Sequence, residues 1–420
     1  MLNVVSGIFN IADLRKKFIF TLGMIILFRL GSHIPVAGVD PIKLQTLFSQ
    51  GNALDFLDLF TGGAMMRFSV FAMGIVPYIN ASIIMQLLTI VIPQLEELSK
   101  EGDAGRKQIA SYTRYLTVVL AAFQAFGMAF WLRNIMLDGY VFPLFLLGTI
   151  VSLTAGSTLV MWFSELMTEK GIGNGASLII FVGIVSRIPS YFAQTATLLK
   201  GGASFAGVII LIAVFLAMIV GIVIVQEAQR RIQVQYAKRI VGRKMYGGQS
   251  TYIPLRINQG GVIPIIFASS VLLFPATIGQ FIPIPFVQQV VGWLSPSGSL
   301  YMLLYFVLIF FFTYFYTAIT FNPTDLAENI KKYGGFVMGI RPGKPTAAYF
   351  EYVLTRLTLV GALFLSIVAI VPNIVENLTH ITSFQGLGST ALLIVVGVAM
   401  DLVRQIETHL VTRQYEGLLA

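Results

Sequence analysis

The 420-residue sequence contains no cysteine and few charged side chains. Without cysteine, the chain has no disulfide, no thiol nucleophile and no cysteine-ligated metal or cluster. Charged residues make up 11% of the chain, against roughly 25% in soluble domains, and 56% of the residues are hydrophobic. A chain of this composition has too few polar groups to cover a water-facing surface, so we predict a membrane protein.

The sequence also lacks the groups that most enzymes and coupled transporters need. No GxxxxGK[ST] phosphate loop is present, and no carboxylate falls in the middle of an apolar run. Glu165, Glu227 and Asp401 lie near the ends of such runs, whereas ion-coupled transporters usually keep an acid within the membrane. We therefore predict a non-enzymatic protein without cofactor or metal, whose energy comes from a partner or a gradient.

Ten apolar runs are candidate membrane spans, and the ninth is short enough to need residues from its flanks. A hydrocarbon core of about 30 Å needs roughly 20 residues of helix. The runs cover residues 18–36, 68–92, 115–131, 141–163, 176–192, 205–225, 262–282, 301–319, 357–371 and 387–403. We expect an all-α membrane protein, with span two interrupted at Pro77.

Lys and Arg residues predict how the chain is oriented. With the N-terminus inside, the inner segments hold 22 of the 28 Lys and Arg residues and the outer segments hold 4. Cytoplasmic loops carry such an excess, so both termini are expected in the cytoplasm. A break near Lys200 divides the chain into halves 1–200 and 201–420 with five spans each. Because five is odd, the second half would lie inverted relative to the first. The span count permits such a repeat, although no residue-level repeat is visible.

The external segment 31–67 contains a short apolar stretch, ALDFLDLFT at 53–61. It is too short to span, and Asp55, Asp58 and Thr61 fall on one helical face. Two interpretations remain open from the residues alone. The stretch is either an interfacial helix or a re-entrant element, and the second is tolerated only where protein or water surrounds it.

Other features have both a structural and a functional interpretation. Ile75, Ile79 and Ile83 form a stripe on span two that could pack or face lipid, and Asn80 and Gln86 could bond across to another helix. The basic loop 226–261 could contact anionic lipid, an acidic partner or ribosomal RNA. In the basic loop 320–356, the turn at residues 339–343 is expected to hold Arg341 outward.

Six long motifs resemble the SecY family of translocon channel subunits. They are GIVPYINASIIMQLL (74–88), KEGDAGRKQIASYTRYLT (100–117), TEKGIGNGASLIIF (168–181), AQRRIQVQYAKR (228–239), QGGVIPIIFASSVLLFPATI (259–278) and GIRPGKPTAAYFEYVLTRLTLVGALFL (339–365). The resemblance covers nearly the whole chain. It implies a ten-helix clamshell that conducts unfolded secretory polypeptides and releases hydrophobic segments sideways into lipid. An inverted-repeat transporter of a small solute is the alternative.

The resemblance also implies roles for particular residues. The apolar pore ring matches Ile75, Ile79, Ala176, Ile180, Ile266 and Ile394, where Ala176 departs from the usual bulky aliphatic residue. The plug matches residues 53–66, in particular Asp55, Phe56, Leu57, Asp58, Phe60, Thr61, Gly62 and Gly63. Asn80, Ile83, Gln86, Gln124 and Phe274 match a lateral gate between spans two and seven.

Partners and location follow from the same resemblance. Arg239, Arg243, Lys244 and Arg341 match the docking loops for the SecA motor ATPase or the ribosome. SecE and SecG subunits, signal sequences, nascent polypeptides and anionic lipids are further expected partners, and a homodimer is possible. The expected location is the plasma membrane of a bacterium.

Overall fold

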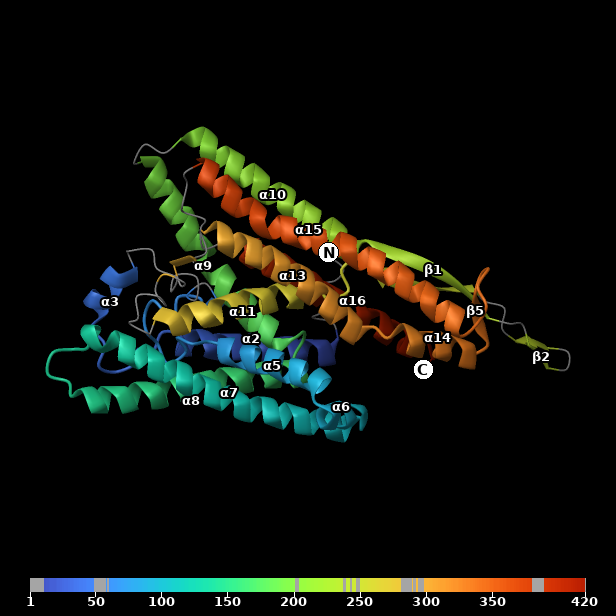
Figure 1. The fold of residues 1–420 in the computed structure, drawn as a ribbon, viewed down its shortest axis with the longest axis horizontal. Helices are drawn as coiled ribbons and strands as arrows, with labels where there is room; N and C mark the ends of the chain where they lie inside the picture. Colours follow the sequence, from blue (N-terminus) through green and yellow to red (C-terminus); the bar gives the residue numbers. More distant parts are fainter. Residues whose placement is uncertain are drawn as a thin grey trace.

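The computed structural model describes residues 11–48, 58, 60–200, 204–236, 239–241, 244–246, 250–280, 289, 292–293, 298–379 and 389–419. Ten of its helices coincide with the ten predicted spans, and Figure 1 shows several of them running lengthwise along the molecule. They are α2 (Ala12–Gly31), α5 (Val76–Val91), α7 (Asp103–Trp131), α8 (Phe142–Lys170), α9 (Gly175–Lys200), α10 (Phe205–Glu227), α11 (Ile263–Gln280), α13 (Ser299–Thr320), α15 (Lys344–Thr379) and α16 (Ser389–Leu419).

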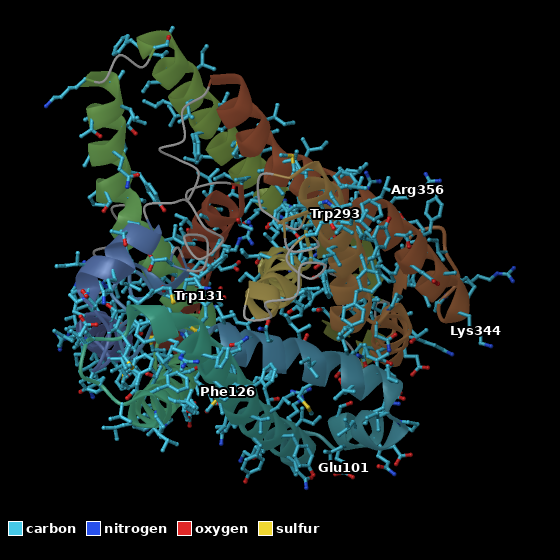
Figure 2. The ribbon with its side chains drawn as sticks, turned by 60° about the vertical axis from the view of Figure 1, so that its left-hand side comes forward. Glu101, Phe126, Trp131, Trp293, Lys344 and Arg356 are labelled. Atoms are coloured by element: carbon cyan, nitrogen blue, oxygen red, sulfur yellow. The ribbon has the colours of Figure 1, made fainter. Side chains whose placement is uncertain are left out.

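The outer surface of these helices is apolar. Val119, Leu144 and Leu216 are 64%, 65% and 59% exposed on three different helices, and Phe126 projects outward from α7 in Figure 2. Among the described residues, six helices are long and apolar enough to cross a membrane. A seventh qualifies if α5 and α6 (Pro93–Lys100), which meet at a bend of 100°, count together. The chain is a multi-pass membrane protein.

Span two differs from its prediction at its beginning. Residues 70–75 form turns, so α5 begins at Val76 with Ile75 as its N-cap. Pro77 therefore lies in the first helical turn, where a missing N–H leaves no bond unmade, and the predicted interruption inside a helix is wrong. Phe68 and Gly74 have φ of 45° and 55°, and these left-handed residues prevent a helix from starting earlier.

The two basic loops are folded together at one end of the bundle. Strand β1 (Gln229–Tyr236) pairs antiparallel with β4 (Ser250–Arg256) and with β5 (Gly335–Val337), so the two loops share a sheet. β2 (Arg239–Val241) and β3 (Lys244–Tyr246) form a separate hairpin. We name this end the sheet end; the opposite one is the α3 end, after α3 (Pro41–Phe48). A 3-10 turn, η1 (Leu132–Ile135), follows α7.

The sheet packs on helices that the predicted loop 320–356 contains. Ile232, Val234 and Leu255 pack with Ile330 of α14 (Pro323–Lys332) and Phe350 of α15 in one buried cluster. Span nine, the shortest predicted run, lies in the middle of the 36-residue α15. The polar first turns of α15 lie beyond the apolar run, so hydropathy marked only the part suited to lipid.

Candidate functional site: an apolar ring with a buried plug

The six predicted ring residues meet in one place. Ile75, Ile79, Ile180, Ile266 and Ile394 are at most 7% exposed and belong to a single apolar cluster. They come from four elements: α5 and the residue before it, α9, α11 and α16. Ala176 is only partly buried and packs against the same cluster.

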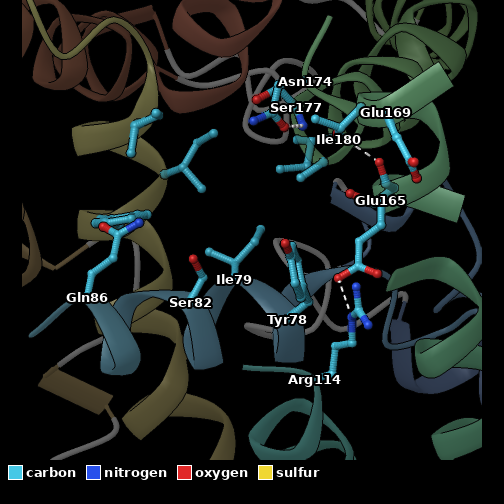
Figure 3. A pocket seen from close by; sticks show the side chains of 16 residues that line it. Tyr78, Ile79, Ser82, Gln86, Arg114, Glu165, Glu169, Asn174, Ser177 and Ile180 are labelled. Atoms are coloured by element: carbon cyan, nitrogen blue, oxygen red, sulfur yellow. Dashed lines mark hydrogen bonds and ion pairs between the residues drawn. The ribbon is translucent and has the colours of Figure 1, made fainter. Parts of the chain in front are cut away.

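A cavity of about 390 Å³ lies against this ring. Ile79, Ile180 and Ile266 form part of its wall together with Ala176, and Figure 3 shows Ile79 and Ile180 extending into it from α5 and α9. The rest of the lining is mostly polar and includes Ser82, Gln86 and Asn174 near the sheet end of α5 and the start of α9. The cavity is thus a polar vestibule closed by apolar side chains.

An ion pair holds one wall of the vestibule. Arg114 Nε on α7 donates to Glu165 Oε1 on α8 at 2.9 Å, beside Tyr78 of α5. The Arg114 side chain is 51% exposed, so the pair contributes little to stability by itself. Its geometric effect is to tie together two helices that flank the opening.

The predicted plug lies on the other side of the ring. Asp58, Phe60 and Thr61 are helical and at most 5% exposed, and Phe60 belongs to the same apolar cluster as the ring. Asp55, Phe56 and Leu57 lie outside the described residues. Since the described part is enclosed by protein, the re-entrant interpretation fits the structure and the interfacial one does not.

Charged and polar contacts hold these residues in their seat. The Asp58 carboxylate pairs with Arg187 of α9 and accepts the Met66 backbone N–H at 2.8 Å. Arg29 of α2 donates from Nη1 to the Gly62 carbonyl oxygen at 2.9 Å. Asp58 is only 1% exposed, so removal of its cation would leave a buried carboxylate without a countercharge.

Two glycines let the plug backbone lie directly on a helix. A Cβ on Gly183 of α9 would come within 2.7 Å of the Phe60 carbonyl oxygen. A Cβ on Gly62 would come within 2.8 Å of the Gly183 Cα, and Gly62 also has φ of +66°. Both positions exclude a side chain, since real Cβ atoms do not approach backbone so closely. The seat is therefore shaped for the backbone of residues 60–62.

The predicted gate residues come from α5, α7 and α11, and α5 and α11 pack on one another. Ile83 and Asn80 are buried on α5, and Gln124 is buried on α7. Asn80 Nδ2 has no hydrogen-bond partner among the described residues. Gln86 lines the vestibule. Phe274 belongs to α11, but its side chain lies outside the described part of the chain.

The predicted docking residues are at the sheet end. Arg341 is exposed in the turn between Gly339 and Gly343, whose φ values of +78° and +101° require glycine, so the predicted turn is confirmed. Arg239 and Lys244 belong to the β2–β3 hairpin, and their side chains are not described. Arg243 lies outside the described residues.

A family model described as SecY matches residues 69–403, which carry the ring and the gate. The chain belongs to the SecY family. Subunits named protein translocase subunit SecY from Synechococcus elongatus and Aquifex aeolicus are 48% and 46% identical to it. The first alignment covers 97% of this chain and 95% of the relative, and the second covers 99% of both. A SecY from Mycobacterium tuberculosis is 46% identical over 100% of both chains.

Solved structures show the same fold at low sequence identity. A protein-conducting channel matches with a TM-score of 0.65 at 18% identity, covering 94% of this chain and 92% of the other. Sec61 in the canine ribosome–channel complex from the endoplasmic reticulum matches with a TM-score of 0.63 at 17% identity and the same coverage. The predicted ten-helix fold is confirmed, and the chain is a subunit of a protein-conducting channel. The small-solute transporter is not favoured.

Arg29 and Arg187 are not among the predicted site residues, although both lie within predicted spans, 18–36 and 176–192. A cation inside a membrane-spanning helix almost always has a partner, so these positions carried a usable signal. The sequence could not identify their partners, because Arg29 lies 33 positions from Gly62 and Arg187 lies 129 positions from Asp58.

Proposed function

We propose that an unfolded polypeptide passes through the ring from the sheet end to the α3 end, and that hydrophobic segments leave between α5 and α11. Five buried isoleucines from four elements meet between a polar vestibule and a seated plug, and this observation supports the proposal. An apolar constriction blocks ions by dewetting and grips a passing chain weakly. It can also widen without breaking hydrogen bonds.

The division into an N-terminal half, residues 1–200, and a C-terminal half, residues 201–420, fits this opening motion. The vestibule is bounded by α5, α7 and α8 of the first half and by α11 of the second. The first turn of α9, at Ala176, also belongs to the first half. A rotation of one half against the other would separate α5 from α11 and let a signal sequence replace their contact.

The channel is passive in this proposal, and its partners supply the energy. The sheet end, with Arg341 exposed on its turn, is the surface proposed to dock a SecA-type motor or the ribosome. Related structures include Sec61 in a ribosome–channel complex and a yeast Ssh1 complex bound to the 80S ribosome. SecE-like and SecG-like subunits would cover part of the apolar outer surface.

The sheet end would face the cytoplasm of a bacterium, with the chain in its plasma membrane. The support is the distribution of 22 Lys and Arg residues on the predicted inner segments against 4 on the outer ones. The bacterial relatives at 46–48% identity agree with this setting.

A photo-crosslinking experiment tests the path. A crosslinking amino acid replaces Ile79 in the ring, and a secretory chain is stalled during transport through the purified channel. The matched control places it at Val119, which is 64% exposed on the outer face of α7. We expect capture of the stalled chain at Ile79 and not at Val119. A stalled chain that never reacts at Ile79 would show that the path lies elsewhere.

A further inference from the structure

A second cavity, of about 190 Å³, lies at the sheet end among elements that follow residue 225. It is enclosed by the end of α10, the end of β4, residues 258–263 before and at the start of α11, the end of α13, and α16. It shares only Ile263 with the vestibule. Nothing in the proposed transport path uses it.

Two guanidinium groups line this cavity. Arg404 of α16 donates to the Gln226 carbonyl oxygen and lies 3.8 Å from Asp401. Arg256, at the end of β4, makes no side-chain hydrogen bond or ion pair with any residue in the described part of the chain. It is close enough to act on the charges of both Arg404 and Asp401. The cavity therefore offers an anion an unused donor fork beside a second cation.

The same cavity also contains acceptors without donors. Asn258 is 4% exposed; its Nδ2 donates to the Gly261 carbonyl oxygen at 2.9 Å, but its Oδ1 has no partner among the described residues. An orphaned buried acceptor is costly unless a ligand or water donates to it. The Asp401 carboxylate, whose single ion pair with Arg404 is long, lies on the wall with it. A simple anion would accept hydrogen bonds from the arginines but would donate none to Asn258 Oδ1 or to the Asp401 carboxylate.

The exposed side of the cavity lies at the sheet-end terminus of α13. Arg256 and Thr320 are its exposed lining residues, and Thr320 is at the last turn of α13. Ile319, next to it, is 46% exposed and continues the apolar outer face of that helix. An apolar helix surface that ends at a polar pocket is the arrangement expected where acyl chains end and headgroups begin.

We propose that this cavity binds the headgroup of a membrane phospholipid whose phosphate carries a primary ammonium, as in phosphatidylethanolamine. The phosphate oxygens accept from Arg256 and Arg404. The ammonium donates to Asn258 Oδ1 and Asp401. A trimethylammonium headgroup has no N–H to donate. A glycerol headgroup donates from its hydroxyls but brings no positive charge to the Asp401 carboxylate, so only the primary ammonium both donates and neutralises.

The test measures which lipids the channel retains. The purified channel is placed in nanodiscs containing equal amounts of phosphatidylethanolamine, phosphatidylcholine and phosphatidylglycerol, released into the gas phase, and weighed by native mass spectrometry. We expect one phosphatidylethanolamine to be retained about tenfold over either competitor, the effect of a charge-assisted hydrogen bond. Arg256→Gln should lower the retention of phosphatidylethanolamine about tenfold, because the phosphate loses the paired N–H donors of one guanidinium.

Asp401→Asn tests the ammonium contact separately from the phosphate contact. It should remove the preference for phosphatidylethanolamine over phosphatidylglycerol while some retention of both persists. Arg356→Gln, an exposed arginine of α15 that stacks on Tyr352 away from the cavity, is the control and should behave as the wild type. Equal retention of all three lipids, a preference for phosphatidylglycerol, or an unchanged Arg256→Gln variant would overturn the proposal. Because the Arg256 side chain is exposed and pairs with no residue in the described part of the chain, its loss should not unfold the protein.

Discussion

At the scale of single residues, the seat of the plug depends on three contacts. Asp58 pairs with Arg187, Arg29 donates to the Gly62 carbonyl oxygen, and the backbone at Phe60 lies against Gly183. The first two are electrostatic and the third is steric. Each can be removed separately, so the contribution of each to the closed channel is measurable.

We predict that Arg187→Gln opens a leak. Loss of the cation leaves the buried Asp58 carboxylate unpaired, at a cost of about 3–5 kcal/mol for a broken buried pair. Potassium efflux from proteoliposomes should rise clearly above wild type. The double variant Asp58→Asn/Arg187→Gln should leak less than Arg187→Gln alone, since no unpaired charge remains. Equal efflux from wild type and Arg187→Gln would contradict the role of the pair.

We predict that Gly183→Ala displaces the plug by steric force alone. The new methyl group would approach the Phe60 carbonyl oxygen within 2.7 Å, so the segment must move outward. The matched control is Gly148→Ala on α8, where the added Cβ meets nothing within 4 Å. Ion efflux should rise for the first variant and stay at the wild-type level for the second. If the two variants leak alike, the backbone contact does not matter for closure.

At the scale of elements, α5 serves three purposes. It begins at the ring with Ile75, lines the vestibule with Gln86, and packs along α11 with Ile83 on the buried side. Its buried Asn80 Nδ2 has no described partner. Within the described part of the chain, α5 therefore buries an uncompensated polar group, and any helix separation that exposes Asn80 to water would relieve its cost.

We predict that Asn80→Leu stabilises the closed channel. The substitution removes a buried unpaired donor, worth about 1–3 kcal/mol, and keeps a similar side-chain size. The unfolding temperature should rise, and preproteins with weakly hydrophobic signals should be transported more slowly. Gln86→Leu is the comparison, because Gln86 borders the vestibule and its amide is open to water. A lower unfolding temperature for Asn80→Leu would show that Asn80 has a partner in the closed state.

At the scale of the whole molecule, the sheet joins the two long basic loops into one platform. β1 from the first loop pairs with β5 from the second, and both rest on α14 and α15. A force applied to the platform therefore acts on α10 and α15 directly. Arg341 extends from the same platform on a turn fixed by two glycines.

We predict that Arg341→Glu abolishes motor-driven transport without unfolding the protein. Arg341 is exposed in a turn whose backbone is set by Gly339 and Gly343, so the substitution changes charge and not structure. Transport assays with a SecA-type motor should show loss of activity at an unchanged unfolding temperature. The control is Arg356→Glu on α15, which should retain transport. Normal transport by Arg341→Glu would remove this turn from the docking surface.

The helices were predictable because hydrocarbon demands long apolar runs, and all ten runs became helices. The start of α5 was not predictable, because residues 68–75 are as apolar as the helix, and the left-handed backbone at Phe68 and Gly74 is not visible in hydropathy. The sheet was missed although Ile232, Val234 and Tyr236 alternate with polar residues, a pattern typical of a strand. The ring positions came from resemblance, and the plug contacts from the structure alone, because they join residues far apart in the sequence.

The two arginines that hold the plug have a consequence for the open pore. When residues 58–62 leave, Arg29 and Arg187 lose a carbonyl oxygen and a carboxylate but remain fixed on α2 and α9. The two positive charges then remain at the exit without the groups that paired with them in the seat. The emptied channel should conduct chloride in preference to cations. Lysine-rich stretches of a transported polypeptide should cross it more slowly than acidic stretches.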